Sequence, residues 1–93
     1  MIQSFRDKES ERIFARERSG RLPPSIQRTA LRKLWILHAA HELMDLKVPP
    51  GNRLEKLTGN RSGQYSVRIN DQWRICFRWN QGNAHDVEIT DYH

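Results

Sequence analysis

The run Asp91-Tyr92-His93 places a carboxylate, a phenol and an imidazole next to one another, directly after a strand-like segment. Between them these groups can abstract a proton, donate a proton and hydrogen-bond a phosphate. Upstream, Arg68 and Arg74 carry guanidinium groups, which bind phosphate oxygens through paired N–H donors. These residue types together predict a proton-transfer site for a substrate that contains phosphate.

The charge of the chain points to the same class of substrate. The formal net charge is +5 and the pI is about 10, which favours a polyanionic partner. Basic residues cluster between positions 47 and 78, where only Glu55 and Asp71 oppose them. The basic residues of this segment are Lys47, Arg53, Lys56, Arg61, Arg68, Arg74 and Arg78. A solvated surface that only promotes solubility is the alternative, and it explains scattered charge better than clustered charge.

Length and composition limit the class of protein. A chain of 93 residues predicts a single domain spanning residues 1–93. It has no apolar run of membrane-spanning length and no signal-peptide core at its start, so we expect a cytoplasmic protein with no membrane contact. Cys76 is the only cysteine, which excludes an intrachain disulfide and a zinc-ribbon site. We interpret Cys76 as a small packing residue in a reducing compartment.

Hydrophobic spacing predicts helices in the first half of the chain. Ile2 to Phe5 predicts a short first strand, and a short amphipathic helix follows from about Asp7 to Arg18, with Gly20 as its stop. A longer helix begins at Pro23-Pro24-Ser25, because proline suits the first turn and serine the cap. Its apolar residues recur at helical spacing to about Leu46, and Pro49-Pro50-Gly51 ends it.

After Gly51 the apolar residues alternate with polar ones, which predicts half-buried antiparallel strands. The strands lie at about 53–57, 65–69, 73–79 and 87–90. A three-residue turn at 70–72 pairs Ile69 with Trp73 and Val67 with Ile75, whereas a two-residue turn would put one side chain on the wrong face. The same argument for 81–83 pairs Phe77 with Val87 and Ile75 with Ile89. The predicted fold is α+β: two N-terminal helices on one face of a small, mostly antiparallel sheet.

This register gathers the basic side chains on the face that the helices leave uncovered. It sets Arg68 opposite Arg74 and Arg74 opposite Thr90, with Tyr92 one step along and Arg78 on the same face. Like charges opposite each other destabilise a sheet, so the two arginines either splay into solvent or bind an anion. We therefore expect a phosphate-binding surface with proton-transfer groups at its C-terminal edge.

Two other readings of the sequence are weaker. His38 and His41 share a helix face, but they lack the four-residue spacing of zinc peptidases, so we expect packing or surface roles and no metal. Stacking on bases is the alternative role for the three tryptophans Trp35, Trp73 and Trp79, but Trp73 and Trp79 fall on the apolar face, which favours core packing.

The ordered set of motifs resembles the HigB-type toxins of the RelE/ParE superfamily of bacterial toxin–antitoxin systems. The set consists of L-x-x-L-x-G-x-R at 54–61, S-V-R at 66–68, Trp73-Arg74 and the D-Y-H run at 91–93, with Ser4-Phe5 near the start. The resemblance covers nearly the whole chain. Each motif is weak by itself, and the set is specific.

The resemblance implies a metal-independent endoribonuclease that needs no cofactor and cleaves mRNA in the ribosomal 30S A site. By position, His93 is the general base or acid, Asp91 orients or assists it, and Tyr92 stacks on or hydrogen-bonds the RNA. Arg74 stabilises the transition state, and Glu55 is a further group that could take a proton. The residues expected to bind RNA are Lys56, Arg61, Arg68, Arg78 and Arg53.

The resemblance also implies partners and a departure from the family pattern. A cognate antitoxin is expected, and operator DNA is expected to bind only the toxin–antitoxin complex. HigB-type members often carry histidine where Glu55 stands and lysine where Thr58 stands, so we expect a slower ribonuclease here. Two alternatives are a non-enzymatic, ParE-like toxin that binds a protein such as gyrase, and a basic nucleic-acid-binding regulator.

Overall fold

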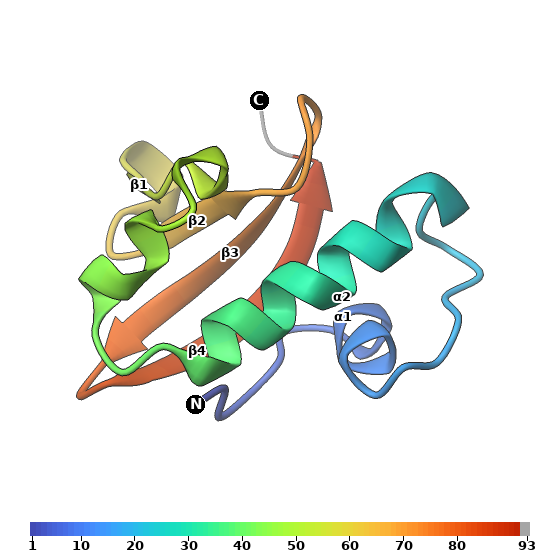
Figure 1. The fold of residues 1–93 in the computed structure, drawn as a ribbon, viewed down its shortest axis with the longest axis horizontal. Coiled ribbons are helices and arrows are strands. Elements are labelled where there is room, and N and C mark those ends of the chain that lie inside the picture. The colour runs from blue at the N-terminus through green and yellow to red at the C-terminus, as the bar shows by residue number, and fades with distance from the viewer. Residues whose placement is uncertain (92–93) are drawn as a thin grey trace.

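A computed structural model describes residues 1–91, and it shows two helices packed on one face of an antiparallel sheet (Figure 1). The helices are α1 (Lys8–Phe14) and α2 (Pro24–Ala39), followed by short 3₁₀ turns at Leu43–Lys47, Pro50–Asn52 and Gly59–Arg61. The strands are β1 (Glu55–Lys56), β2 (Tyr65–Arg68), β3 (Trp73–Asn80) and β4 (Asn83–Asp91), which lie side by side in chain order. The predicted α+β fold is confirmed.

Both helices end earlier than the sequence predicted, because side-chain caps and backbone turns intervene. The Asp7 carboxylate accepts the Ser10 N–H at 2.7 Å and starts α1, and the left-handed conformation of Arg16 (φ 65°) ends it before Gly20. Helix α2 stops at Ala39 rather than near Leu46. There the Asp45 carboxylate accepts the N–H groups of His41 and Glu42, each at 3.0 Å, and opens a separate 3₁₀ turn.

The predicted first strand is reduced to two isolated parallel bridges, Ile2 with Ala84 and Phe5 with Val87. The ladder cannot continue between them because β4 is irregular at Asp86, which adopts a left-handed conformation (φ 52°). The Asp86 N–H donates instead to the Ser4 hydroxyl at 2.9 Å. The start of the chain therefore lies along the outer edge of β4 without forming a strand.

The predicted β2–β3 register is confirmed: Tyr65 pairs with Phe77, Val67 with Ile75 and Arg68 with Arg74. The predicted β3–β4 register is correct only for the residue pairs that lie away from the turn. The turn has two residues, Gln81 and Gly82, both with positive φ, so Asn80 pairs with Asn83. A bulge then shifts the register by one, which restores the predicted pairing of Ile75 with Ile89 but removes that of Phe77 with Val87.

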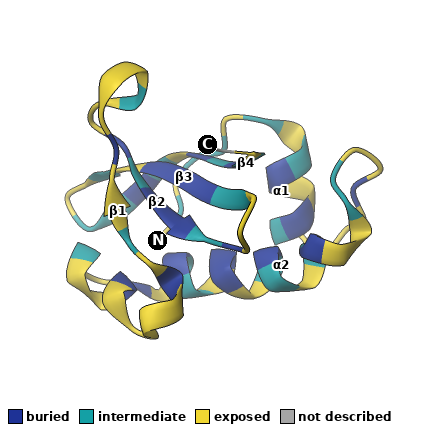
Figure 2. Ribbon diagram, turned by 90° about the horizontal axis from the view of Figure 1, so that it is seen from above, coloured by how far each residue is buried: buried dark blue, intermediate teal, exposed yellow. Residues whose placement is uncertain are grey.

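The core lies between the helices and the apolar face of the sheet (Figure 2). Its buried members include Ile13, Ile26, Leu34 and Leu37 from the helices and Val67, Ile75, Phe77 and Val87 from the strands. Trp73 and Trp79 are partly buried against this core, which confirms their predicted packing role. Within residues 1–91, no helix has the length and apolar character that a membrane crossing requires.

A buried polar contact ties the segment before β1 to α2. Lys33, only 6% exposed, donates its ammonium hydrogen to Asn52 Oδ1. The Asn52 amide in turn donates to the carbonyls of Leu46 and Val48, each at 3.2 Å. Burial lowers the pKa of Lys33, and the positive charges of Arg32 and Arg68 lower it further. Asn52 thus fixes the residues that lead into β1.

Replacing Asn52 with alanine is expected to reduce the free energy of unfolding by about 2–4 kcal/mol, because it removes three hydrogen bonds and leaves a buried ammonium group without its acceptor. Urea unfolding followed by circular dichroism measures the change. The matched control is Asn60→Ala, at an exposed position, where we expect a change within about 0.5 kcal/mol. Equal stability of the two variants would show that the Asn52 contacts contribute little.

Candidate active site

Arg74 is the centre of the candidate site, because its guanidinium is held in one orientation by neutral acceptors. Its Nε donates to Ser66 Oγ at 2.7 Å, and one terminal nitrogen, Nη2, donates to the Arg53 carbonyl at 2.6 Å. The side chain is only 12% exposed. Within residues 1–91 its other terminal nitrogen, Nη1, has no hydrogen-bond partner, so the fixed fork retains donors for an anion.

Glu55 supplies a carboxylate beside this guanidinium. Its Oε2 lies 3.8 Å from Arg74 Nη2, and its side chain is 58% exposed. The contact follows from the sheet, since β1 pairs Glu55 with Ser66, the residue that binds Arg74 Nε. A group that can accept a proton therefore adjoins a cation that can bind phosphate.

Arg68 and Arg74 are Cα partners, as predicted, yet each guanidinium has its own acceptors. Arg68 forms an ion pair with Asp71, whose side chain is 99% exposed. An exposed pair of this kind contributes little to stability and exchanges readily. A phosphate can replace Asp71 at Arg68 at low cost, so the two arginines can present a joint anion site.

Asp91, by contrast, lies apart from Arg74. It is the Cα partner of Trp73, and its Oδ2 accepts a hydrogen bond from the Gln72 amide at 2.9 Å. Because side chains alternate along a strand, Asp91 lies on the face of Trp73 and not on the face of Arg74. Tyr92 and His93, the other two residues of the predicted proton-transfer group, lie outside the described residues.

The remaining basic residues differ in how far they are available. Lys56 is exposed on β1, and Arg53 is exposed in a left-handed conformation (φ 43°) that directs its carbonyl to Arg74. Arg61 binds Glu88 at 2.7 Å and also Gln64. Arg78 lies 3.7 Å from Asp86 and about 13 Å along β3 from Arg74. Arg53 therefore adjoins the Arg74 site. Lys56 pairs with Tyr65 rather than Ser66, so its side chain lies on the other face of β1, and Arg78 is peripheral.

The sheet face opposite the helices is more covered than the sequence suggested. Ser66 and Cys76 alternate with the core residues, and both are fully buried. The β1–β2 connection contributes the buried residues Leu57 and Gln64, and Arg61 from this connection pairs with Glu88 on β4. This cover separates the partly exposed strip around Arg68, Arg74 and Thr90 from the exposed Arg78 farther along β3, so the candidate site is a narrow strip rather than an open surface.

Cys76 is a packing residue, as expected. Burial raises the pKa of its thiol, the positive charges of Arg61 and Arg74 act in the opposite direction, and the negative charge of Glu88 adds to the rise. A buried thiol with a raised pKa is a poor nucleophile. Cys76 therefore takes no part in the chemistry of the site.

The two histidines that the sequence predicted on the long helix have different surroundings. His38 Nδ1 accepts the Ile2 N–H at 3.1 Å, and its ring contacts Phe14 and Trp35. His41 is exposed beyond the end of α2. Over residues 1–91, no group of three or more histidine, cysteine, aspartate or glutamate side chains could hold a metal ion.

Sequence reasoning missed the residues that hold Arg74. Ser66 belongs to the S-V-R motif, to which no separate role is assigned, although the predicted register already places it diagonal to Arg74 on the same face. The role of the Arg53 carbonyl depends on a left-handed backbone conformation, and no sequence pattern indicated it.

Comparison with known proteins assigns the chain to a family. A family model described as the RelE-like toxin of type II toxin-antitoxin system HigB matches residues 3–93. The chain is 45% identical over 85 residues to Toxin HigB-1 of Vibrio cholerae, covering 90% of each chain. It is 28% identical over 93 residues to Endoribonuclease HigB of Proteus vulgaris, with full coverage of both. An uncharacterized protein of Haemophilus influenzae is 27% identical over 91 residues.

The thiol of Cys76 is expected to react with a disulfide reagent at pH 8 at least about 100-fold more slowly in the native protein than in urea, because burial excludes the reagent and disfavours the thiolate. Because the pKa of the Cys76 thiol is raised, labelling of the native protein is expected to stay slow until the pH exceeds the pKa of an ordinary thiol. The absorbance of the coloured thiol that the reagent releases gives the labelling rates of the native and the unfolded protein. Native labelling as fast as that of the unfolded chain would mean that the β1–β2 connection does not cover Cys76.

Proposed function

Because this chain belongs to the RelE-like toxins of the HigB type II toxin–antitoxin systems, we propose that it is an endoribonuclease that cleaves mRNA on the ribosome and so inhibits translation. The observation that supports the proposal is Arg74, fixed by Ser66 and the Arg53 carbonyl beside the Glu55 carboxylate. The word endoribonuclease stands in the name of the Proteus vulgaris relative, which the chain matches over its full length.

The proposed reaction is transfer of a phosphodiester within the RNA. The 2′-oxygen forms a bond to the adjacent phosphorus while the bond from phosphorus to the 5′-oxygen breaks. A base takes the proton of the 2′-hydroxyl, and an acid gives a proton to the leaving 5′-oxygen, which leaves a 2′,3′-cyclic phosphate. The protein must also stabilise the extra negative charge that develops on the phosphate oxygens.

Arg74 supplies this charge stabilisation. Its guanidinium is already oriented before RNA binds, so little reorganisation is needed as the negative charge develops. Its low exposure of 12% also means that a bound phosphate would meet it in a partly desolvated place, where the interaction is stronger than in water. Arg68 adds a second cation once the phosphate replaces Asp71.

We assign the proton transfers to Glu55 and to the C-terminal group. Glu55 is within reach of a phosphate bound to Arg74, and it can take the proton of a 2′-hydroxyl. His93 is proposed as the second acid or base, and Tyr92 as a residue that stacks on or hydrogen-bonds the RNA. The Asp91 carboxylate is proposed to assist His93 rather than to contact the phosphate at Arg74, since it lies on the other face of the sheet.

The wider basic surface is proposed to bind the RNA backbone, with Arg53 nearest the site, Arg61 and Arg78 at its margin, and Lys56 on the other face of β1. The substrate is proposed to be mRNA in the 30S A site, and the place of action the cytoplasm. As a member of a type II system, the chain has an antitoxin as its partner. Operator DNA is proposed to bind only the complex of the two.

Primer-extension mapping of mRNA on programmed ribosomes tests the proposed function. Wild-type protein is expected to produce defined cleavage sites, and Arg74→Ala is expected to cleave at least about 100-fold more slowly. A chain that lacks His93 is expected to lose cleavage as well, whereas the exposed-site control Lys47→Ala keeps it. Wild-type protein that leaves mRNA intact but inhibits gyrase would overturn the ribonuclease and support the ParE-like alternative.

Replacing Glu55 with histidine is expected to raise the cleavage rate at pH 7 by about tenfold, because an imidazole exchanges protons near neutral pH and its cationic form can bind phosphate. Glu55→Gln is the matched control: it keeps the size of the side chain, removes its proton chemistry and is expected to lower the rate. Single-turnover cleavage of the same mRNA gives both values. A histidine variant no faster than wild type would show that Glu55 does not limit the reaction.

A further inference from the structure

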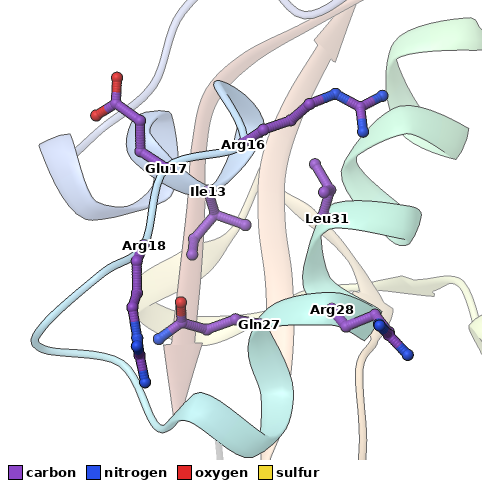
Figure 3. A pocket seen from close by; sticks show the side chains of 7 residues that line it. All are labelled: Ile13, Arg16, Glu17, Arg18, Gln27, Arg28 and Leu31. Carbon is purple, nitrogen blue, oxygen red and sulfur yellow. The ribbon is translucent and has the colours of Figure 1, made fainter.

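The helical layer carries a groove on the side away from the sheet, remote from Arg74. Two adjoining hollows, of about 240 Å³ and 560 Å³, share Arg16, Arg28 and Leu31. They run between the C-terminal end of α1 and the outward face of α2, as Figure 3 shows for the smaller hollow. From Gln27 to Ala39 the groove follows α2 for about 18 Å.

The floor of this groove is apolar and partly open to solvent. It is formed by Leu31, Trp35, Ile36 and Ala39 of α2. The Trp35 side chain is stacked on Phe14 at 4.7 Å between ring centres, yet Trp35 remains 40% exposed. A large exposed aromatic residue in a concave apolar strip is typical of a site for another macromolecule.

The rim of the groove is basic. Arg16, Arg28 and Arg32 flank the floor, and within residues 1–91 none of them forms an ion pair. The Arg16 guanidinium lies 5.7 Å from the centre of the Trp35 ring. Among the described residues, Glu17 is the one acidic residue that lines either hollow, and in Figure 3 its carboxylate points away from Leu31. The rim therefore presents positive charge without a matching acid.

The wall of the groove is held in place by hydrogen bonds within the chain. The segment after α1 is tied to α2 by Gln27, whose amide donates to the carbonyls of Ser19 at 2.9 Å and Leu22 at 2.8 Å and whose oxygen accepts the Ser19 N–H. The Ser19 hydroxyl accepts two further N–H groups and donates to Glu9. A groove that is formed in advance loses little conformational entropy on binding.

We propose that this groove docks an acidic amphipathic helix of the antitoxin. The inference rests on membership of the toxin–antitoxin family, which supplies the partner, and does not require the ribonuclease reaction. Apolar side chains three and four residues apart on the partner helix fill the strip over Leu31, Trp35 and Ile36. Carboxylates beside these apolar side chains of the partner helix reach Arg16, Arg28 and Arg32, which form no ion pair within residues 1–91.

Charge and shape favour this occupant over two others. A second copy of the chain, docked symmetrically through the same groove, would bring its arginines against the same arginines and be repelled. RNA would match the charge of the rim, but stacked bases need aromatic platforms, and Leu31, Ile36 and Ala39 make most of the floor aliphatic. An acidic amphipathic helix matches both the positive charge of the rim and the apolar surface of the floor.

Titration calorimetry with the purified cognate antitoxin tests the proposal. Arg28→Glu and Arg32→Glu are each expected to weaken binding at least about tenfold, and the double variant more. Both positions are exposed, so the variants should fold. Lys47→Glu makes the same change of charge at an exposed position outside the groove, and wild-type affinity is expected for it. Trp35→Ala is expected to lose the apolar part of the affinity, with circular dichroism confirming that it is folded.

Each contrary result identifies another arrangement. Unchanged antitoxin affinity in Arg28→Glu and Arg32→Glu overturns the proposal, as does an equal loss in Lys47→Glu or the absence of any complex with wild type. Loss of single-stranded RNA binding or of self-association in the groove variants, with antitoxin binding intact, would assign the groove to RNA or to a second copy. Arg74→Ala is expected to bind antitoxin normally, so failure of the proposed ribonuclease and failure of the docking site give different results.

Discussion

The structure depends on the register of the three longer strands. Pairing Val67 with Ile75 and Ile75 with Ile89 puts one continuous apolar row under the helices, and the period of two then fixes every other side chain. The same pairing places Ser66, Arg74 and Thr90 together on the opposite face. The core and the candidate site are therefore two consequences of one alignment, and a slip by one residue would destroy both.

Arg74 shows how a mostly buried cation can be kept without a strong partner charge. Two of its donors reach a serine hydroxyl and a backbone carbonyl, and its carboxylate neighbour, Glu55, remains at 3.8 Å. Neutral acceptors take up part of the hydrogen-bonding capacity of the guanidinium but do not neutralise it. The positive field is thus preserved for a phosphate, which a tight ion pair would have cancelled. The Lys33–Asn52 contact has the same character and fixes the residue next to Arg53.

The sequence predicted the features that follow from hydrophobic periodicity: the fold class, the strand order, the β2–β3 register and the packing of Trp73 and Trp79. It failed where one polar side chain or one backbone angle overrides the pattern. The apolar spacing continues past Ala39, but the Asp45 carboxylate caps a new turn and breaks the helix. The site was found only in part, since Arg74 and Glu55 lie together whereas their support comes from Ser66 and from a left-handed Arg53. The sequence did not predict the basic groove on α2. Most of the groove residues lie at helical spacing on α2, but a helical pattern does not show which face of the helix is left partly uncovered beside Arg16.

Because of the bulge at Asp86, the geometry of the site does not depend on the length of the β3–β4 hairpin. At the tip the two strands pair as a two-residue turn requires, and beyond the bulge they pair as the apolar face requires. A single residue inserted at the tip or deleted from it can be absorbed by losing or gaining such an irregularity, while Ile75 keeps its place opposite Ile89. Relatives of different length can therefore vary in this hairpin and still deliver the same arginine to the same position.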